Sequence, residues 1–233
     1  MTKGPIGIIG AMKPEVDILL EWMDISSLEE LAHTTAYIGE LFGRDAIVIE
    51  SGIGKVNASM ITALFIERYN PSLIINTGVA GALSDTLDVT DMVVSTDVLH
   101  HDVDAVEFGY ELGQVPGMPK MYYADKGLVK LAMTAISKNQ DITGHSGQVV
   151  SGDSFISNAA QKGTILQNFK KAYAVDMESA AIAQACYQFS TPFVIIRSIS
   201  DRADDSADMA YEEFLSKACI HSSEVVKLLM KDL

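Results

Sequence analysis

The sequence has few cysteines, few basic residues and no long apolar run. Its 233 residues include two cysteines, Cys186 and Cys219, whose spacing is not that of metal ligands, so we expect buried reduced thiols. Lys and Arg number 17 against 31 Asp and Glu, a formal net charge of -14 that disfavours binding to nucleic acid or to an anionic membrane surface. No apolar run approaches the roughly 20 residues that a membrane-spanning helix needs.

The N-terminal segment lacks the features of a secretory leader. It has one lysine, Lys3, and a short apolar stretch that stops at Gly10. Together with the expected reduced thiols, this favours a cytoplasmic protein.

Hydrophobic residues make up 48% of the chain, enough to build a large core. Apolar runs alternate with helical patterns, and we find no repeat or linker, so we predict one α/β domain over residues 1–233 with helices on both faces of a mixed sheet. We expect the strand over 72–77 to stop at Gly78. The predicted strands are 6–12, 37–42, 46–51, 72–77, 91–98, 148–150, 172–177 and 193–199, and the predicted helices are 14–22, 56–69, 126–137, 178–189 and 211–230.

Three of these strands each lead to an acidic residue. Glu15 follows the first strand, Glu178 follows the strand over 172–177, and Asp201 follows the strand over 193–199 through Ser200. In an α/β sheet, ligands bind outside the carboxyl ends of the strands. Three carboxylates at that edge without evident metal ligands indicate acid and base chemistry on a neutral, hydroxyl-rich substrate.

Each acid also has a simpler interpretation when it is taken alone. Glu15 and Glu178 suit the first turn of a helix, and Ser200-Asp201 suits an N-cap. Their grouping favours an active site. Arg197 supports it, because a charge inside an apolar strand must pair with a carboxylate, and Glu178 and Glu15 are its expected partners.

Two further patterns have a structural interpretation. Ser51-Gly52-Ile53-Gly54-Lys55 lacks the spacing of a phosphate loop, and we expect a tight strand-to-helix turn whose backbone can still contact a ligand. Consecutive residues rarely point at one ion, so we expect 100–104, His-His-Asp-Val-Asp, to be a solvated loop and predict no metal site.

Six motifs, taken together, are similar in order and spacing to those of the bacterial 5'-methylthioadenosine/S-adenosylhomocysteine nucleosidases. The resemblance runs from about residue 5 to about residue 230. The motifs are Gly10-Ala11-Met12-Lys13-Pro14-Glu15, Ser51-Gly52-Ile53-Gly54-Lys55-Val56, Asn76-Thr77-Gly78-Val79-Ala80-Gly81, Val150-Ser151-Gly152-Asp153-Ser154-Phe155-Ile156, Val175-Asp176-Met177-Glu178 and Arg197-Ser198-Ile199-Ser200-Asp201.

The resemblance implies a three-layer α/β/α sandwich of the nucleoside phosphorylase type with a central mixed, twisted sheet. It implies a homodimer without a cofactor. The implied reaction is hydrolysis of the N-glycosidic bond of 5'-methylthioadenosine and S-adenosylhomocysteine, and also of 5'-deoxyadenosine. Its implied roles are methionine salvage and relief of product inhibition in methyl transfer.

The resemblance also implies residue roles. Glu15 resembles the base that activates water, and Asp201 the acid that protonates the departing adenine, with Ser200 orienting it. Glu178 resembles the residue that binds the ribose hydroxyls, and Arg197 the arginine that organises these carboxylates.

For substrate binding, the resemblance implies that Phe155 stacks on adenine and that the backbone of Ile156 contacts its polar edge. The ribose and thioether pocket would be lined by Met12, Ile53, Met177 and Tyr211. The long irregular stretch over 100–123 would carry Phe108, Tyr110 and Pro116 into the neighbouring subunit's site. Val79 stands where many members have serine, and Tyr211 where phenylalanine is common.

Three alternatives compete with this interpretation, and the residues argue against the first and the third. A phosphorylase of the same fold holds phosphate with arginines and a serine, whereas this chain has Asn76 and Val79 at those positions and Glu15 on the nucleophile's side. Hydrolysis of 6-amino-6-deoxyfutalosine uses the same residues in some relatives. A nucleoside sensor has no need for an acid and a base, which the retained Glu15 and Asp201 provide.

Overall fold

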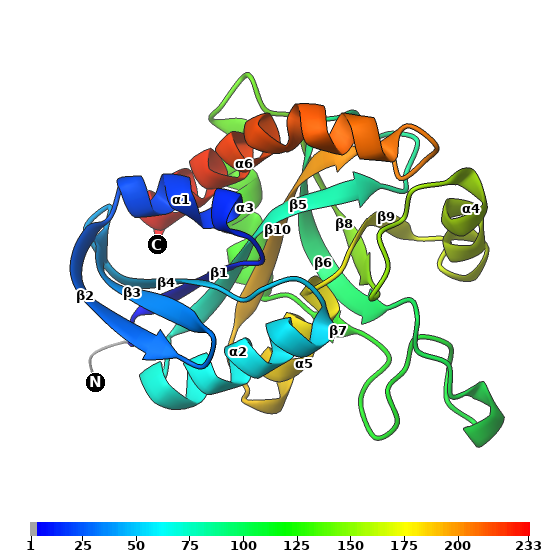
Figure 1. Ribbon diagram of the computed structural model, residues 1–233, viewed down its shortest axis with the longest axis horizontal. Coiled ribbons are helices and arrows are strands. Elements are labelled where there is room, and N and C mark those ends of the chain that lie inside the picture. The colour runs from blue at the N-terminus through cyan, green and yellow to red at the C-terminus, as the bar shows by residue number, and fades with distance from the viewer. Residues whose placement is uncertain (1–3) are drawn as a thin grey trace.

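The strands of the computed structural model form one mixed sheet between helices, and the structure describes residues 4–233, so Lys3 lies outside the described part (Figure 1). In chain order the elements are β1 (Ile6–Gly10), α1 (Lys13–Glu21), β2 (Asp24–Leu31), β3 (Thr34–Leu41), β4 (Arg44–Glu50), α2 (Lys55–Tyr69), β5 (Leu73–Ala82), β6 (Met92–His100), η1 (Val106–Phe108), β7 (Tyr122–Tyr123), α3 (Lys126–Ser137), β8 (Gly144–Ser151), α4 (Ala159–Asn168), β9 (Ala172–Asp176), α5 (Ser179–Gln188), β10 (Phe193–Asp201) and α6 (Ala207–Asp232).

The sheet is open at one end and closed on itself at the other. Its order is β10-β6-β8-β9-β5-β1-β4-β3-β2, and an additional pairing of β10 with β5 closes a ring of five strands. β5 makes this possible because its first half pairs with β1, whereas Gly81 and Ala82 near its end pair with β9. The carboxyl ends of β1, β5 and β10, which are parallel, therefore meet at one edge.

Helices cover both faces of this sheet, as the three-layer expectation requires (Figure 1). On one face Val16 of α1, Leu128 of α3 and Val225 of α6 belong to one buried cluster. On the other face Phe65 of α2 and Ile182 of α5 belong to a second. The apolar side chains thus form two buried cores, one on each face of the sheet.

The prediction that Gly78 ends its strand is wrong, since β5 continues through Gly78 to Ala82. Gly78 has φ +154, and a Cβ there would lie 2.4 Å from Oε1 of Glu15. The glycine thus allows a strand to pass directly beneath a carboxylate. Gly81 does the same for Asp201, whose Oδ1 would lie 2.9 Å from a Cβ at that position.

The buried cysteines were predicted correctly, because Cys186 and Cys219 are both buried and free. Within residues 4–233, none of the helices combines the length and the apolar character needed to cross a membrane.

Candidate active site

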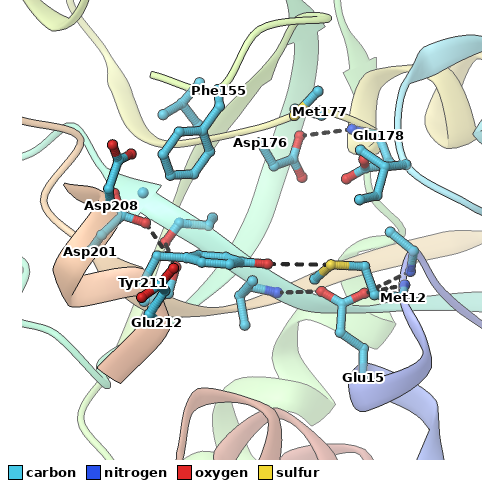
Figure 2. Close-up of a pocket in the computed structure, with 17 residues that line it drawn as sticks. Met12, Glu15, Phe155, Asp176, Met177, Glu178, Asp201, Asp208, Tyr211 and Glu212 are labelled. Atoms are coloured by element: carbon cyan, nitrogen blue, oxygen red, sulfur yellow. Dashed lines mark hydrogen bonds between the residues drawn. The ribbon is translucent and has the colours of Figure 1, made fainter. Parts of the chain in front are cut away.

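A cavity of about 500 Å³ lies at the edge where β1, β5, β9 and β10 end, and the N-terminal turns of α6 pass beside it (Figure 2). All three strand-end acids line it, as the sequence predicted. The lining residues are Ala11, Met12, Glu15, Ile53, Val79, Ala80, Gly81, Phe155, Val175, Asp176, Met177, Glu178, Ser200, Asp201, Asp208, Tyr211 and Glu212.

Glu15 is held in place by backbone donors. Oε2 accepts the N–H groups of Ala11 at 2.7 Å and Met12 at 3.0 Å, and Oε1 accepts that of Val79 at 3.0 Å. Burial nevertheless raises the pKa of Glu15 above its usual value, opposed by the nearby charge of Arg197 and by these three N–H groups. The result is an oriented carboxylate of raised basicity, which is what a general base requires.

Asp201 is the second buried acid, 2% exposed at the end of β10. Its Oδ2 accepts the hydroxyl of Ser200 at 2.9 Å, and its Oδ1 accepts the N–H of Ala203 at 2.8 Å. Burial raises the pKa of Asp201, although both hydrogen bonds favour its ionised form. The contact with Ser200 agrees with the orienting role expected for that residue.

Glu178 sits at the start of α5 and accepts the N–H of Gly54 at 2.9 Å. The glycine turn over 51–55 therefore holds a site residue through its backbone, and its expected contact with a ligand stays a prediction. Burial, followed by the charge of Asp176, raises the pKa of Glu178 to about 8. At neutral pH this side chain is mostly protonated, so it can donate a hydrogen bond to a sugar oxygen.

The Glu178 titration predicts a pH-dependent stability. Because the pKa is higher in the folded chain than its usual 4.5, this contribution is complete below about pH 4.5 and is lost as pH rises towards 8. When the pH is raised from 6 to 9, the free energy of unfolding of the wild type, measured with urea, should fall by about 1–2 kcal/mol more than that of Glu178→Gln. The exposed control Glu40→Gln should follow the wild type, and equal slopes for Glu178→Gln and the wild type would contradict the assignment.

The predicted partners of Arg197 were wrong. Its Nε donates to Oδ2 of Asp176 at 2.8 Å, and its Nη2 donates to Oδ1 of Asn76 at 2.7 Å. Asp176 also accepts the hydroxyls of Ser151 and Ser179. Arg197 does not line the cavity, and it acts on Glu15 and Glu178 through its charge. Asp176, the residue missed from sequence, is the one that satisfies the buried guanidinium.

Removing Asp176 should be strongly destabilising. Asp176→Ala leaves the 1% exposed Arg197 without its carboxylate, so we expect a loss of about 3–5 kcal/mol in the free energy of unfolding by urea. The matched control Asp17→Ala breaks the exposed pair with Lys13 and should produce no measurable change. Equal losses in both variants would show that the buried pair is unimportant to the fold.

Apolar side chains complete the lining of the cavity. The Phe155 and Tyr211 rings meet edge to face with centroids 5.6 Å apart, and the Tyr211 hydroxyl donates to Sδ of Met12 at 3.3 Å (Figure 2). Ile53, Val79 and Met177 also line the cavity, as listed above. Ile156 instead lines a small adjoining cavity that it shares with Phe155 and Asp201.

Three predicted binding residues lie away from this cavity. Phe108, Tyr110 and Pro116 belong to the loop between β6 and β7, and Phe108 is 83% exposed. This loop extends from the body of the subunit (Figure 1). Their expected place is a neighbouring subunit's site.

The expectation of a solvated loop over 100–104 is partly wrong. His100 is buried, and its Nε2 lies 2.9 Å from Oε1 of Gln184. Asp102 binds Nζ of Lys55 at 2.5 Å and accepts the N–H of Asp153 at 3.0 Å. The segment ties the loop to the glycine turn. Among residues 4–233, no group of three or more His, Cys, Asp or Glu is placed to hold a metal ion.

Sequence reasoning also missed two acids of α6. Asp208 and Glu212 line the cavity on either side of Tyr211 in the sequence. They share one face of the helix because they are four residues apart. Because the predicted site residue Tyr211 lies between them in the sequence, this spacing could have indicated that both acids line the site.

Comparisons with known proteins agree with this geometry. Residues 5–231 match the family model described as the phosphorylase superfamily. The chain is 49% identical to the 5'-methylthioadenosine/S-adenosylhomocysteine nucleosidase of Staphylococcus epidermidis, over 98% of this chain and 100% of that one.

Two solved structures are also similar. The Neisseria meningitidis 5'-methylthioadenosine/S-adenosylhomocysteine nucleosidase in complex with methylthio-immucillin-A superposes with a TM-score of 0.96 and 41% identity, covering 98% of this chain and 99% of that one. A futalosine hydrolase of Helicobacter pylori gives a TM-score of 0.93 at 32% identity, covering 98% and 97%.

Proposed function

The chain belongs to the phosphorylase superfamily and, within it, to the 5'-methylthioadenosine/S-adenosylhomocysteine nucleosidases, and from that membership we propose which bond it cleaves and how. The proposed reaction is hydrolysis of the N-glycosidic bond of 5'-methylthioadenosine and S-adenosylhomocysteine, which releases adenine and the thioribose. 5'-Deoxyadenosine is a further proposed substrate.

The observation that carries this proposal is the pair of buried carboxyl groups, Glu15 and Asp201, that line one largely apolar cavity and lie at separate ends of it (Figure 2). Cleavage of a nucleosidic bond places positive charge on the sugar and negative charge on the base. Asp201 donates its proton to adenine as the bond breaks. Glu15 removes a proton from the water that attacks the anomeric carbon. The ionised Glu15 also favours the positive charge that develops on the sugar.

The lining also argues for water over phosphate as the nucleophile. It contains six acidic side chains, and the described lining residues include no Lys, Arg or His. A phosphate dianion beside Glu15 would meet a carboxylate where it needs a cation. Water, in contrast, is activated by that same group.

Substrate choice is tested by adenine release from four compounds. We expect 5'-methylthioadenosine and S-adenosylhomocysteine to be cleaved with the highest kcat/KM, 5'-deoxyadenosine more slowly, and 6-amino-6-deoxyfutalosine least. Cleavage of the futalosine alone would overturn the proposal, and binding without any cleavage would favour a sensor.

We also propose a homodimer, with Phe108, Tyr110 and Pro116 near the neighbouring site. Supporting it is an apolar stripe on α2 formed by Val56, Met60 and Leu64, which are 74%, 40% and 41% exposed. Their spacing of four residues places them on one helix face. A groove of about 560 Å³ beside this stripe is lined by residues of α2, α5 and the β6–β7 loop. An exposed patch of this kind is typical of an association surface.

A charge in this stripe should dissociate the dimer. Met60→Lys is expected to shift the mass from dimer to monomer in light scattering after gel filtration and to raise KM, because each site then loses its neighbour's loop. The control Leu28→Lys lies on the edge strand β2, 61% exposed, and should stay dimeric. A wild type that is monomeric at micromolar concentration would contradict the dimer.

The cytoplasmic location expected from the sequence stays a prediction, and the two free buried cysteines are compatible with it.

A further inference from the structure

The first turns of α6 form one wall of the cavity. Asp208, Tyr211 and Glu212 lie on one helix face, because they are three and four residues apart, and all three line the cavity (Figure 2). Asp208 and Glu212 are exposed, whereas Tyr211 is partly buried. This wall therefore joins the interior of the cavity to solvent.

Tyr211 spans the cavity from α6 to the turn that carries Glu15. Its hydroxyl donates to the thioether sulfur of Met12, and its ring meets that of Phe155. Burial raises the pKa of Tyr211 to about 12, so the hydroxyl stays a neutral donor at physiological pH. The hydroxyl thus has a thioether sulfur as its partner, and a substrate sulfur would take the place of Met12 Sδ at this donor.

The position of Tyr211 corresponds to one part of the proposed substrate. Adenine is assigned to the side of Asp201 and Phe155, and the ribose hydroxyls to Glu178. The 5' substituent then takes the remaining side, towards Met12, Ile53 and the α6 wall, where the cavity opens to solvent. On this placement, a substituent longer than methylthio extends along the α6 wall, where the exposed Asp208 and Glu212 line the cavity.

We propose that the Asp208–Tyr211–Glu212 face of α6 selects substrates by their 5' substituent. Tyr211 favours a thioether sulfur, and the two carboxylates favour a substituent that is uncharged or carries an ammonium group over one whose only charge is a carboxylate. This inference rests on the proposed function. It predicts that a tail carrying an ammonium group is preferred over a tail whose only charge is a carboxylate.

The proposed selection by the charges of Asp208 and Glu212 is tested with a matched pair of substrates. S-adenosylhomocysteine ends in an ammonium and a carboxylate, and its deaminated analogue, 5'-(3-carboxypropylthio)-5'-deoxyadenosine, keeps only the carboxylate. We expect the wild type to prefer the first by about fivefold or more in kcat/KM. The double variant Asp208→Asn/Glu212→Gln should bring this ratio close to one, and 0.5 M salt should also reduce it in the wild type.

The control carries the same change of charge outside the cavity. Asp205→Asn/Glu213→Gln alters two exposed acids beside the proposed pair that do not line the cavity, and it should keep the wild-type ratio. The proposed selection by charge would be overturned if the ratio of the two kcat/KM values were unchanged in the Asp208→Asn/Glu212→Gln variant. An equal change of this ratio in the control would overturn it as well. If 5'-methylthioadenosine is cleaved while the ratio is unchanged, this inference alone fails. If 5'-methylthioadenosine is not cleaved at all, the proposed function fails.

The Tyr211 hydroxyl has a separate test. Tyr211→Phe keeps the ring against Phe155 and removes the donor, so we expect kcat/KM to fall about two- to fivefold for 5'-methylthioadenosine relative to 5'-deoxyadenosine, which lacks the sulfur. A parallel fall for both substrates would show a structural role only, and would remove the sulfur preference.

Discussion

Asp201→Asn should reduce kcat for adenine release from 5'-methylthioadenosine by about a thousandfold or more. An amide keeps the shape of the side chain and its contacts with Ser200 and Ala203, but it has no proton to donate to the departing base. Binding of 5'-methylthioadenosine, measured by calorimetry, should stay within about threefold of the wild type, since the cavity is otherwise unchanged.

The control for this variant is Asp205→Asn, which neutralises a nearby exposed acid that does not line the cavity. It should keep kcat near the wild-type value. Near-normal turnover by Asp201→Asn would remove Asp201 from the role of proton donor. Loss of binding together with turnover would instead indicate a disrupted site.

Glu15→Gln should have the second large effect, a fall in kcat of about a hundredfold to ten-thousandfold. The glutamine cannot accept a proton from water. Its NH2 group would also face an N–H donor of Ala11, Met12 or Val79, which the carboxylate now satisfies. The substrate should therefore bind and stay uncleaved, as seen by mass spectrometry of the extracted complex.

A control on the same helix separates this effect from a general loss of charge. Glu21→Gln changes an exposed acid at the end of α1 and should leave kcat unaltered. Adenine release by Glu15→Gln at the native rate would show that another group activates the water.

The pKa directions predict a bell-shaped dependence of kcat/KM on pH. Activity falls on the acid side when Glu15 becomes protonated and on the alkaline side when Asp201 loses its proton. Both pKa values are raised by burial, so the profile should lie above the usual range of free carboxyl groups. Asp201→Asn should abolish the alkaline limb of whatever activity it retains.

The proximity of Glu15 and Asp201 could be predicted from the sequence, because apolar runs identified β1 and β10 and ligands bind beyond the carboxyl ends of parallel strands. Glu178 was grouped with them on the same argument, but β9 is antiparallel to β5. Glu178 reaches this edge because β9 pairs with Gly81 and Ala82, the last residues of β5. The three-layer fold followed from the same alternation of apolar runs and helical patterns.

The partner of Arg197 could not be predicted in this way. Glu15, Glu178 and Asp176 all end strands near the guanidinium, and choosing among them requires side-chain direction. Asp176 lies at the end of β9, where Ser151 and Ser179 also bind it, so it is the acid held against Arg197. Glu15 is held by backbone N–H groups, which leaves it directed to the cavity.

Besides the short β7 and η1, the sequence analysis missed β2 and α4, whose sequences lack the patterns that packing normally imposes. β2 is an edge strand that is exposed at most positions and has a register shift between Ile25 and Ser27, so no regular apolar alternation marks it. In α4 one residue, Ile165, is buried, and the helix begins at an Asn158 cap. Tertiary context defines both elements more than local propensity does.

The central claim is that a carboxylate pair hydrolyses the substrate with water. The most direct measurement is the initial rate of adenine release from 5'-methylthioadenosine in phosphate-free buffer and again with 50 mM phosphate, with mass spectrometry of the sugar product. We predict equal rates and free methylthioribose in both cases. A rate that requires phosphate, with methylthioribose 1-phosphate as product, would contradict the role of Glu15 and make the enzyme a phosphorylase.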